Sequence, residues 1–146
     1  MKFILASHGR ASEGLLDSVN MLLGPQEEVE AYVLLPEEEP ERLGERLRAA
    51  FEGQDEGDVV FFTDLFHGSP FNQVVELSRT HDLYHVTGMN VPVLIEALVA
   101  RNAGATAAEV CERAVAAATD SVRDVRKLMD ARAASDQMDS NDEEEF

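Results

Sequence analysis

The chain has few basic residues and one cysteine, and it has no long hydrophobic run. Among 146 residues, 12 Lys and Arg stand against 29 Asp and Glu, a formal net charge of −17. A nucleic-acid-binding surface needs clustered Lys and Arg side chains, so we expect no nucleic-acid binding. Cys111 has no partner for an internal disulfide, and we interpret it as a buried thiol without a catalytic role. No segment approaches the roughly 18 apolar residues of a membrane helix, and the amino terminus lacks a signal-peptide core, so we expect a cytosolic protein.

Composition divides the chain into a body and an acidic tail. With 45% hydrophobic and 28% charged residues, the whole chain lies in the range of globular proteins. Residues 130–146 carry seven acids, one base and few large apolar side chains. We therefore predict one domain over residues 1–129 and a flexible tail over 130–146. The acidity either attracts a basic protein partner or only keeps the chain dissolved, and the sequence leaves both interpretations open.

Apolar runs of strand length alternate with segments of helical period. This pattern predicts an α/β fold with three α/β/α layers around a mainly parallel, four-stranded sheet in the order 2-1-3-4. The predicted strands are residues 2–7, 29–35, 58–63 and 84–89. Thr106 and Glu109 form a capping box at the start of a further helix. For residues 121–128 the spacing favours a helix, with an added antiparallel edge strand as the alternative.

Polar residues follow two of these strands at the point where each strand ends. His8 follows the first strand and Asp64 follows the third. Right-handed crossovers bring the carboxyl ends of parallel strands to one edge, where ligands and chemistry gather. A carboxylate that accepts the proton of one imidazole nitrogen leaves the other nitrogen free to attack. We therefore predict that His8 is a nucleophile and that Asp64 orients its ring.

The segment after Asp64 has features of a phosphate-binding helix start. Ser69 precedes Pro70 as an N-cap residue precedes the first helical residue, so a helix would point free amides at the same edge. Gly68 and Gly9 would allow close approach of the backbone. Each feature alone also fits an ordinary helix start or loop. Together they favour a site that passes a phosphoryl group through His8.

The other histidines have weaker assignments. His67 lies in the same loop and is a candidate modulator of the site, while we interpret His81 and His85 as surface or packing residues. The spacing of His8 and His67 does not support a metal site, so we predict no metal. No P-loop or dinucleotide fingerprint is present, and we predict no cofactor.

The sequence resembles the enzyme IIA component of the mannose-type sugar phosphotransferase system over about residues 1–128. The segments that carry the resemblance are Ser7-His8-Gly9, the run from Thr63 to Asn72, and the run from Gly88 to Glu96. The second run, Thr-Asp-Leu-Phe-His-Gly-Ser-Pro-Phe-Asn, is highly specific, whereas a strand followed by His-Gly is weak on its own.

The resemblance implies a function and a set of partners. His8 would be phosphorylated by the carrier protein HPr and discharged to the enzyme IIB component, with the membrane components IIC and IID further downstream. Asp64 would hold the ring, and Ser69 would bind the phosphoryl group. Members of this family form homodimers that can exchange a carboxyl-terminal edge strand, here near residues 121–128. The family usually has glycine where this chain has His67.

Three alternatives remain at the level of sequence. The phosphotransfer subunit of dihydroxyacetone kinase has a similar fold and a strand-end histidine. Short tetrapyrrole metal chelatases also begin with a strand and a His-Gly loop. A regulator that binds other proteins according to its phosphorylation is the third.

Overall fold

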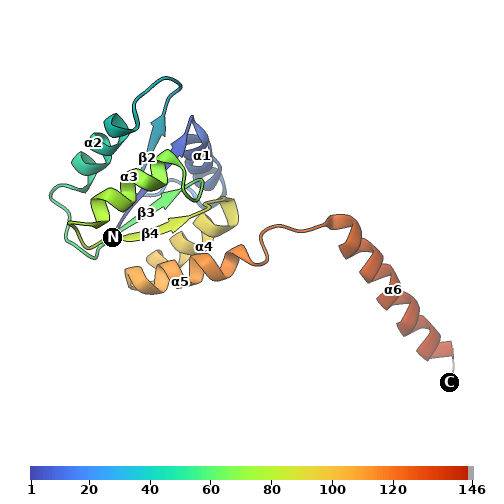
Figure 1. Cartoon of the computed structure of the whole chain (residues 1–146). Helices are drawn as coiled ribbons and strands as arrows, with labels where there is room; N and C mark the ends of the chain where they lie inside the picture. The colour runs from blue at the N-terminus through green and yellow to red at the C-terminus, as the bar shows by residue number, and fades with distance from the viewer. Residues whose placement is uncertain (145–146) are drawn as a thin grey trace.

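The computed structural model describes residues 1–144, and its middle layer is a parallel sheet of four strands (Figure 1). The order β2-β1-β3-β4 is the predicted one. The strands are β1 (Lys2–His8), β2 (Val29–Leu34), β3 (Val59–Thr63) and β4 (Tyr84–Thr87). β1 pairs with β2 on one side and with β3 on the other, so both central strands are flanked by neighbours.

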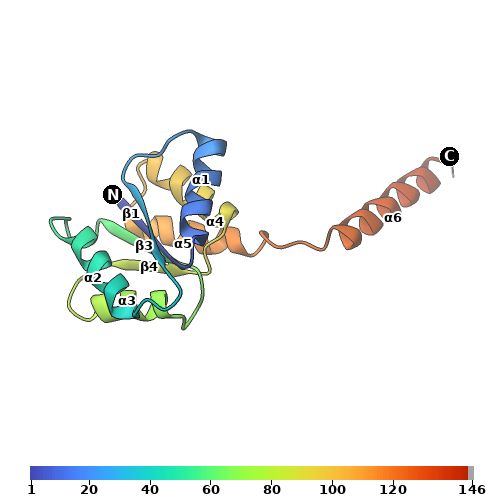
Figure 2. The ribbon, with the colours of Figure 1, turned by 90° about the horizontal axis from the view of Figure 1, so that it is seen from above.

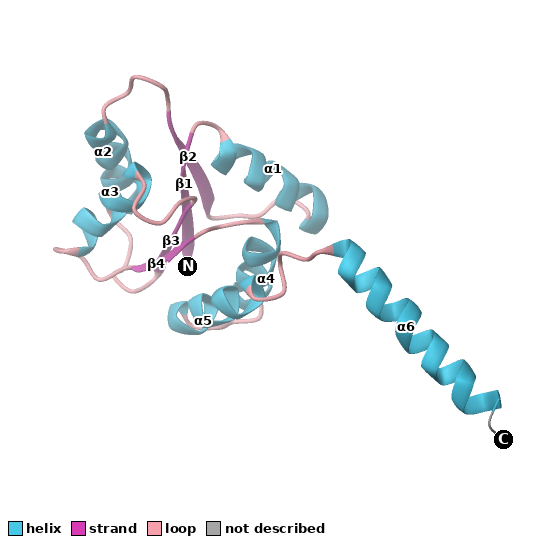
Figure 3. Cartoon of the chain, turned by 45° about the vertical axis from the view of Figure 1, so that its right-hand side comes forward, coloured by secondary structure: helices cyan, strands magenta, loops and turns pink. Residues whose placement is uncertain are grey.

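Helices cover both faces of the sheet, as Figures 2 and 3 show. One face carries α2 (Pro40–Phe51) and α3 (Ser69–Ser78), and the other carries α1 (Ala11–Leu23), α4 (Val91–Asn102) and α5 (Ala107–Ala118). This arrangement is the predicted three-layer fold. It brings the carboxyl ends of β1 and β3 to the same edge, beside the start of α3.

Alternating side chains of the central strands form two separate cores. Phe3 and Phe62 are fully buried under α1, α4 and α5, whereas Ile4 and Phe61 are fully buried under α2 and α3. Successive residues of a strand point to opposite faces, so burial of both faces requires the unbroken apolar runs seen in the sequence. The central strands are therefore held from both sides, which fixes the positions of their polar ends.

Side chains and prolines define the helix starts. Thr106 and Glu109 make the predicted capping box of α5. Asn90 caps α4 by accepting the Val93 N–H at 3.0 Å, a role that the sequence prediction missed. The predicted N-cap of α3 is wrong. Gly68 occupies that position, and Ser69 is already the first helical residue and makes no capping bond.

The carboxyl-terminal segment corrects two predictions. Residues 125–144 form a single helix, α6 (Val125–Glu144), so residues 130–144 of the predicted flexible tail are helical. Within residues 1–144 no fifth strand is present. The helix predicted over 121–128 is correct only for 125–128, because residues 121–124 form a turn and loop between α5 and α6. The Asp124 carboxylate accepts the Lys127 N–H at 3.2 Å and so caps the first turn. Residues 145 and 146 of the predicted tail lie outside the described residues.

Candidate functional site

His8 and Asp64 meet at the edge where β1 and β3 end. Asp64 Oδ2 accepts two hydrogen bonds from His8, one from the backbone N–H at 2.9 Å and one from ring Nδ1 at 2.9 Å. The His8 side chain is 45% exposed, whereas that of Asp64 is 20% exposed. The imidazole is therefore open to a partner molecule, while the carboxylate that orients it is largely shielded.

These two bonds determine which nitrogen of His8 can react. A carboxylate accepts hydrogen bonds, so Nδ1 carries the proton that Asp64 receives, and Nε2 keeps its lone pair. The second carboxylate oxygen of Asp64, Oδ1, is buried and has no hydrogen-bond partner within the described residues. Its shielding from water strengthens the electrostatic interaction between the carboxylate and the imidazole. The arrangement presents Nε2 as a nucleophile at the rim.

Gly68 lies directly against the His8 ring. A Cβ atom at this position would lie 2.6 Å from His8 Cε1 and 3.4 Å from Nε2, so any larger residue would displace the ring. Gly68 is also the N-cap of α3, and its carbonyl accepts the Asn72 N–H at 2.9 Å. The amides of the first helical turn have no acceptor within a helix, so the free amino end of α3 begins beside Nε2. Such an end favours an anion.

Two serines fix the loop between β1 and α1, and the sequence prediction assigned them no role. The buried Ser7 hydroxyl accepts the Ser12 N–H at 2.8 Å and donates to the Gly9 carbonyl at 2.9 Å. Ser12 Oγ donates to the Tyr32 carbonyl at 2.7 Å. Gly9 has a φ of +55°, a conformation that favours glycine, and its N–H donates to the Leu34 carbonyl at 2.7 Å. A serine directly before the motif histidine was the available signal.

His67 occupies a strained position in the loop that leads to α3. The Gly68 N–H donates to the Leu65 carbonyl at 3.0 Å and closes a turn in which His67 has a φ of +63°. Left-handed backbone at the third residue of a turn favours glycine or asparagine. The exposed His67 ring packs on Phe66, with centroids 3.8 Å apart, and edge-on against Phe71. This geometry explains why glycine suits the position.

His85 belongs to a buried network behind the site. Its Nε2 lies 2.7 Å from the hydroxyl of Thr63, which also contacts the Thr87 hydroxyl at 3.0 Å. Its ring packs against Phe71, with centroids 5.1 Å apart. Burial lowers the pKa of His85 to about 4, so the ring is neutral near pH 7. The interpretation of His85 as a packing residue agrees with this geometry.

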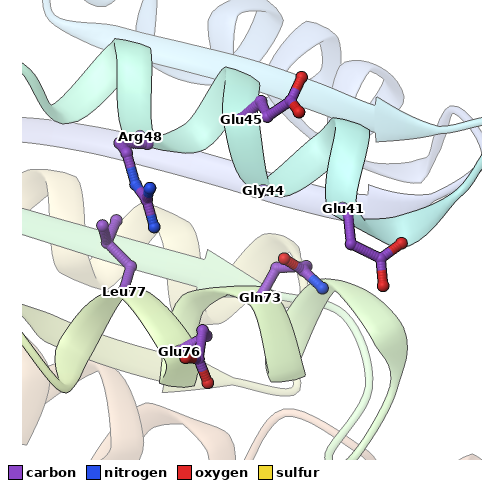
Figure 4. Close-up of a pocket in the computed structure, with 7 residues that line it drawn as sticks. All are labelled: Glu41, Gly44, Glu45, Arg48, Gln73, Glu76 and Leu77. Atoms are coloured by element: carbon purple, nitrogen blue, oxygen red, sulfur yellow. The ribbon is translucent and has the colours of Figure 1, made fainter.

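A separate groove of about 260 Å³ lies between α2 and α3 (Figure 4). Arg48 and Gln73 extend into it from opposite helices. A Cβ on Gly44 would overlap the Gln73 carboxamide, so the glycine lets the two helices approach closely. None of the residues that line this groove belongs to the rim around His8.

Two further observations concern metal binding and membrane insertion. Among residues 1–144, no three His, Cys, Asp or Glu side chains gather closely enough to hold a metal ion. No helix in this part of the chain combines the length and the apolar character needed to cross a bilayer.

Cys111 is half-buried, and burial raises the pKa of its thiol to about 11, which keeps it protonated near neutral pH.

Solved structures place the fold among IIA components of sugar phosphotransferase systems. The EIIA component from Streptococcus agalactiae matches with a TM-score of 0.79 at 23% identity, over 86% of this chain and 98% of its own. The mannose/sorbose specific IIA subunit from Enterococcus faecalis matches with a TM-score of 0.77 at 25% identity, over 84% and 92%. These matches confirm the predicted α/β architecture.

Sequence comparison gives the family. Residues 2–115 match the model of the PTS system fructose IIA component family, and the chain belongs to that family. It is 38% identical over 101 residues to the mannose-specific EIIAB component of Escherichia coli K12, and this match covers 68% of the chain but only 31% of that relative. It is 29% identical over 105 residues to the sorbose-specific EIIA component of Lacticaseibacillus casei, covering 70% and 75%. The resemblance inferred from the motifs is confirmed.

Proposed function

We propose that His8 Nε2 is the phosphoryl acceptor of this IIA component. The observation that carries the proposal is the pair of bonds from His8 to Asp64 Oδ2, both 2.9 Å long, which leaves Nε2 free beside Gly68. The donor is a phosphohistidine on HPr, and the recipient is a histidine side chain of an enzyme IIB component. Transport then proceeds through the membrane components IIC and IID.

Transfer follows from the protonation state of the ring. The Nε2 lone pair forms a bond to phosphorus in line with the bond from phosphorus to the donor nitrogen, which breaks and leaves its electron pair on the donor. The Nδ1 proton stays on His8, so the phosphorylated ring is cationic. Asp64 stabilises this cation and keeps the ring in place. In discharge to IIB, the side chain of the acceptor forms the bond to phosphorus, and the bond from phosphorus to His8 Nε2 breaks and returns its electron pair to Nε2.

The start of α3 supplies the phosphate-binding groups. The transferred group carries negative charge, and the free amides at the amino end of α3 attract it. Gly68 lets the backbone lie against Nε2, and Gly9 turns the chain on the opposite side. Ser69, the half-buried first residue of α3, is in our proposal a further phosphate-binding residue that acts through its hydroxyl. His67 modulates access from the outer side of the loop.

Charge and exposure suggest how the partners approach. A formal charge of −17 favours cytosolic proteins with a basic face and speeds their encounter at low salt. Leu65 and Phe66, at 58% and 61% exposure, lie in the loop next to His8 and provide apolar contact area for a docked protein. HPr and IIB would use this rim in turn, because each must reach the same nitrogen. We also expect a homodimer, as the family resemblance implies.

Phosphorylation in vitro tests the proposal. Incubation with labelled phosphoenolpyruvate, Mg²⁺, enzyme I and HPr should label the wild-type chain in an acid-labile, alkali-stable manner, which is typical of phosphohistidine. The His8→Ala variant should take up no label and should retain the wild-type circular dichroism spectrum. Equal labelling of both proteins would overturn the assignment of His8.

The same preparation separates the alternatives. If the labelled chain passes its phosphoryl group to a dihydroxyacetone kinase partner and not to IIB, the chain would belong to the dihydroxyacetone kinase system. Tight binding of Co²⁺, measured by calorimetry and lost in His8→Ala, would instead favour a chelatase. We expect discharge to IIB and no such Co²⁺ binding.

A further inference from the structure

Helix α6 lies apart from the body in all three ribbon views (Figures 1–3). Its larger apolar side chains are exposed, with Leu128 at 41% and Met138 at 71%. Most helical stability in proteins comes from packing against other elements, which α6 lacks, and the Asp, Ser and Asn residues of its second half lower its helix propensity. Isolated, α6 would be poorly stable. Packing against a binding partner would raise the stability of the helix.

The charges of α6 are arranged against its own dipole. Residues 123–132 carry four bases and two acids, whereas residues 133–144 carry five acids and no base. A helix dipole favours acids at the amino end and bases at the carboxyl end, so the arrangement in α6 is the unfavourable one. Within residues 1–144, Lys127 and Arg132 form no ion pair. The charges that destabilise a single helix are complementary between two helices that run in opposite directions.

The apolar positions have the same two-fold relation. Leu128, Ala131, Ser135 and Met138 follow one another at spacings of three, four and three, which places them along one face of the helix. Leu128 and Met138 lie at equal distances in sequence on either side of Ala133. Two antiparallel copies centred on this alanine would set each Leu128 against Met138 of the other copy. The small residues at the centre would let the helices approach closely.

We propose that α6 pairs in antiparallel orientation with α6 of a second copy of this chain. The basic first half of each helix then lies along the acidic second half of the other, over the shared residues 125–141 and a length of about 25 Å. The body of the chain is a poor alternative partner, because residues 1–122 carry 8 bases and 21 acids and repel the acidic half of α6. The contact differs from an exchanged edge strand, and it is independent of the phosphoryl transfer proposed above.

Charge reversal in the full chain tests the pairing. One variant combines Arg126→Glu, Lys127→Glu and Arg132→Glu, and a second combines Asp136→Lys, Asp139→Lys and Glu143→Lys. Sedimentation equilibrium should give a wild-type dimer that weakens as salt increases, because the ion pairs are screened. Each variant alone should dimerise at least tenfold more weakly. An equimolar mixture of the two should form a heterodimer, because the reversed halves are complementary again.

A matched control reverses charges on the body. Arg42→Glu with Arg79→Glu should leave the dimer unchanged, because both residues lie outside α6. A monomeric wild-type chain at 100 μM, a dimer that persists in both reversed variants, or a mixture that fails to dimerise would each overturn the proposal. Persistence in both would point to the exchanged strand. Labelling of His8 in the same samples reports separately on the proposed function, which survives any of these results.

Discussion

The rim around His8 and the packed surroundings of His85 hold the same side chain under opposite conditions. His8 is half-exposed, and its Nδ1 is bound by a carboxylate, so Nε2 is open. His85 is largely buried, and its Nε2 is occupied by the Thr63 hydroxyl at 2.7 Å. Burial lowers the pKa of His85 to about 4, which leaves it a neutral packing group. The surroundings, rather than the residue type, decide which imidazole has a ring nitrogen open to a partner molecule.

The comparison is tested most strongly by changing each histidine to glutamine. His8→Gln should abolish phosphoryl labelling, because the amide nitrogen has no free lone pair to attack phosphorus. His85→Gln should be labelled at close to the wild-type rate, since its ring lies behind the site and contacts Thr63 and Phe71 instead. Rapid-quench labelling with phosphorylated HPr measures both rates. Loss of labelling in His85→Gln with the fold intact would contradict the separation of the two roles.

Asp64→Asn should slow the labelling of His8 by roughly 10- to 100-fold, because a hydrogen bond to a charged group contributes about 1.5–3 kcal/mol. The asparagine can still accept from His8, but it no longer balances the charge of the phosphorylated ring. The rate of transfer from HPr is the measurement, with urea unfolding as the check that the fold is retained. Wild-type transfer kinetics in this variant would refute the orienting role of Asp64.

Gly68→Ala should slow labelling by roughly tenfold, since a small displacement of a reacting group is costly. The added Cβ would come within 2.6 Å of His8 Cε1 and push the ring from its position. Gly14→Ala is a matched control, because no atom lies within 4 Å of a Cβ built there. The control should be labelled normally and should gain helix stability. Equal labelling rates for the two variants would show that Gly68 is not needed for the position of the His8 ring.

The pH dependence of stability should distinguish His85 from the exposed histidines. Because the pKa of His85 falls from an ordinary value of about 6.5 to about 4 on folding, the unfolded chain binds a proton in this window that the folded chain does not. The free energy of unfolding should therefore decrease as the pH falls from about 6.5 to about 4, and be fully retained above that range. Urea titrations of wild type and His85→Gln should show a shallower slope in the variant. Identical slopes would mean that burial does not prevent protonation of the His85 ring in the folded chain.

His67→Gly should give the smallest effect. Removal of a left-handed non-glycine residue should stabilise the fold by up to about 1 kcal/mol, partly offset by the greater freedom of glycine in the unfolded chain. Opening the rim to water should also quicken hydrolysis of the phosphorylated protein. Loss of label over time, at equal initial labelling, measures this. An unchanged lifetime would remove His67 from the list of modulators.

Local sequence signals predicted most elements of the body. The apolar runs at Phe3 and Phe61 marked strands that are buried on both faces, and the capping box at Thr106 marked a helix start. The start of α3 was placed one residue late, because serine before proline also fits an N-cap followed by N1. Here the Gly68 carbonyl accepts the Asn72 N–H and begins the helix one residue earlier. The close contact of Gly68 with the His8 ring leaves room only for glycine at this N-cap position.

The segment after α5 shows the limit of composition as a guide. Its many acids and few large apolar residues predicted a flexible tail, yet residues 130–144 belong to helix α6, whose first turn is capped by Asp124. Local capping is short-range and leaves little trace in average composition. The contacts of Ser7 with Ser12 and Gly9 escaped prediction for another reason, because hydroxyl direction depends on how the loop folds.

The order of strands and helices, the nucleophile candidate at the end of β1 and the acidic character of the molecule were determined by the sequence alone. These properties follow from periodicity and residue type, which act over a few positions. The strand-end topology predicted that His8 and Asp64, 56 residues apart, lie close together, but only the tertiary structure decided how they bind, with both hydrogen bonds of 2.9 Å to Asp64 Oδ2. Parallel pairing of β1 with β3 aligns their ends, and no local pattern carries that information. The nitrogen that we propose as the phosphoryl acceptor is therefore left open by the fold.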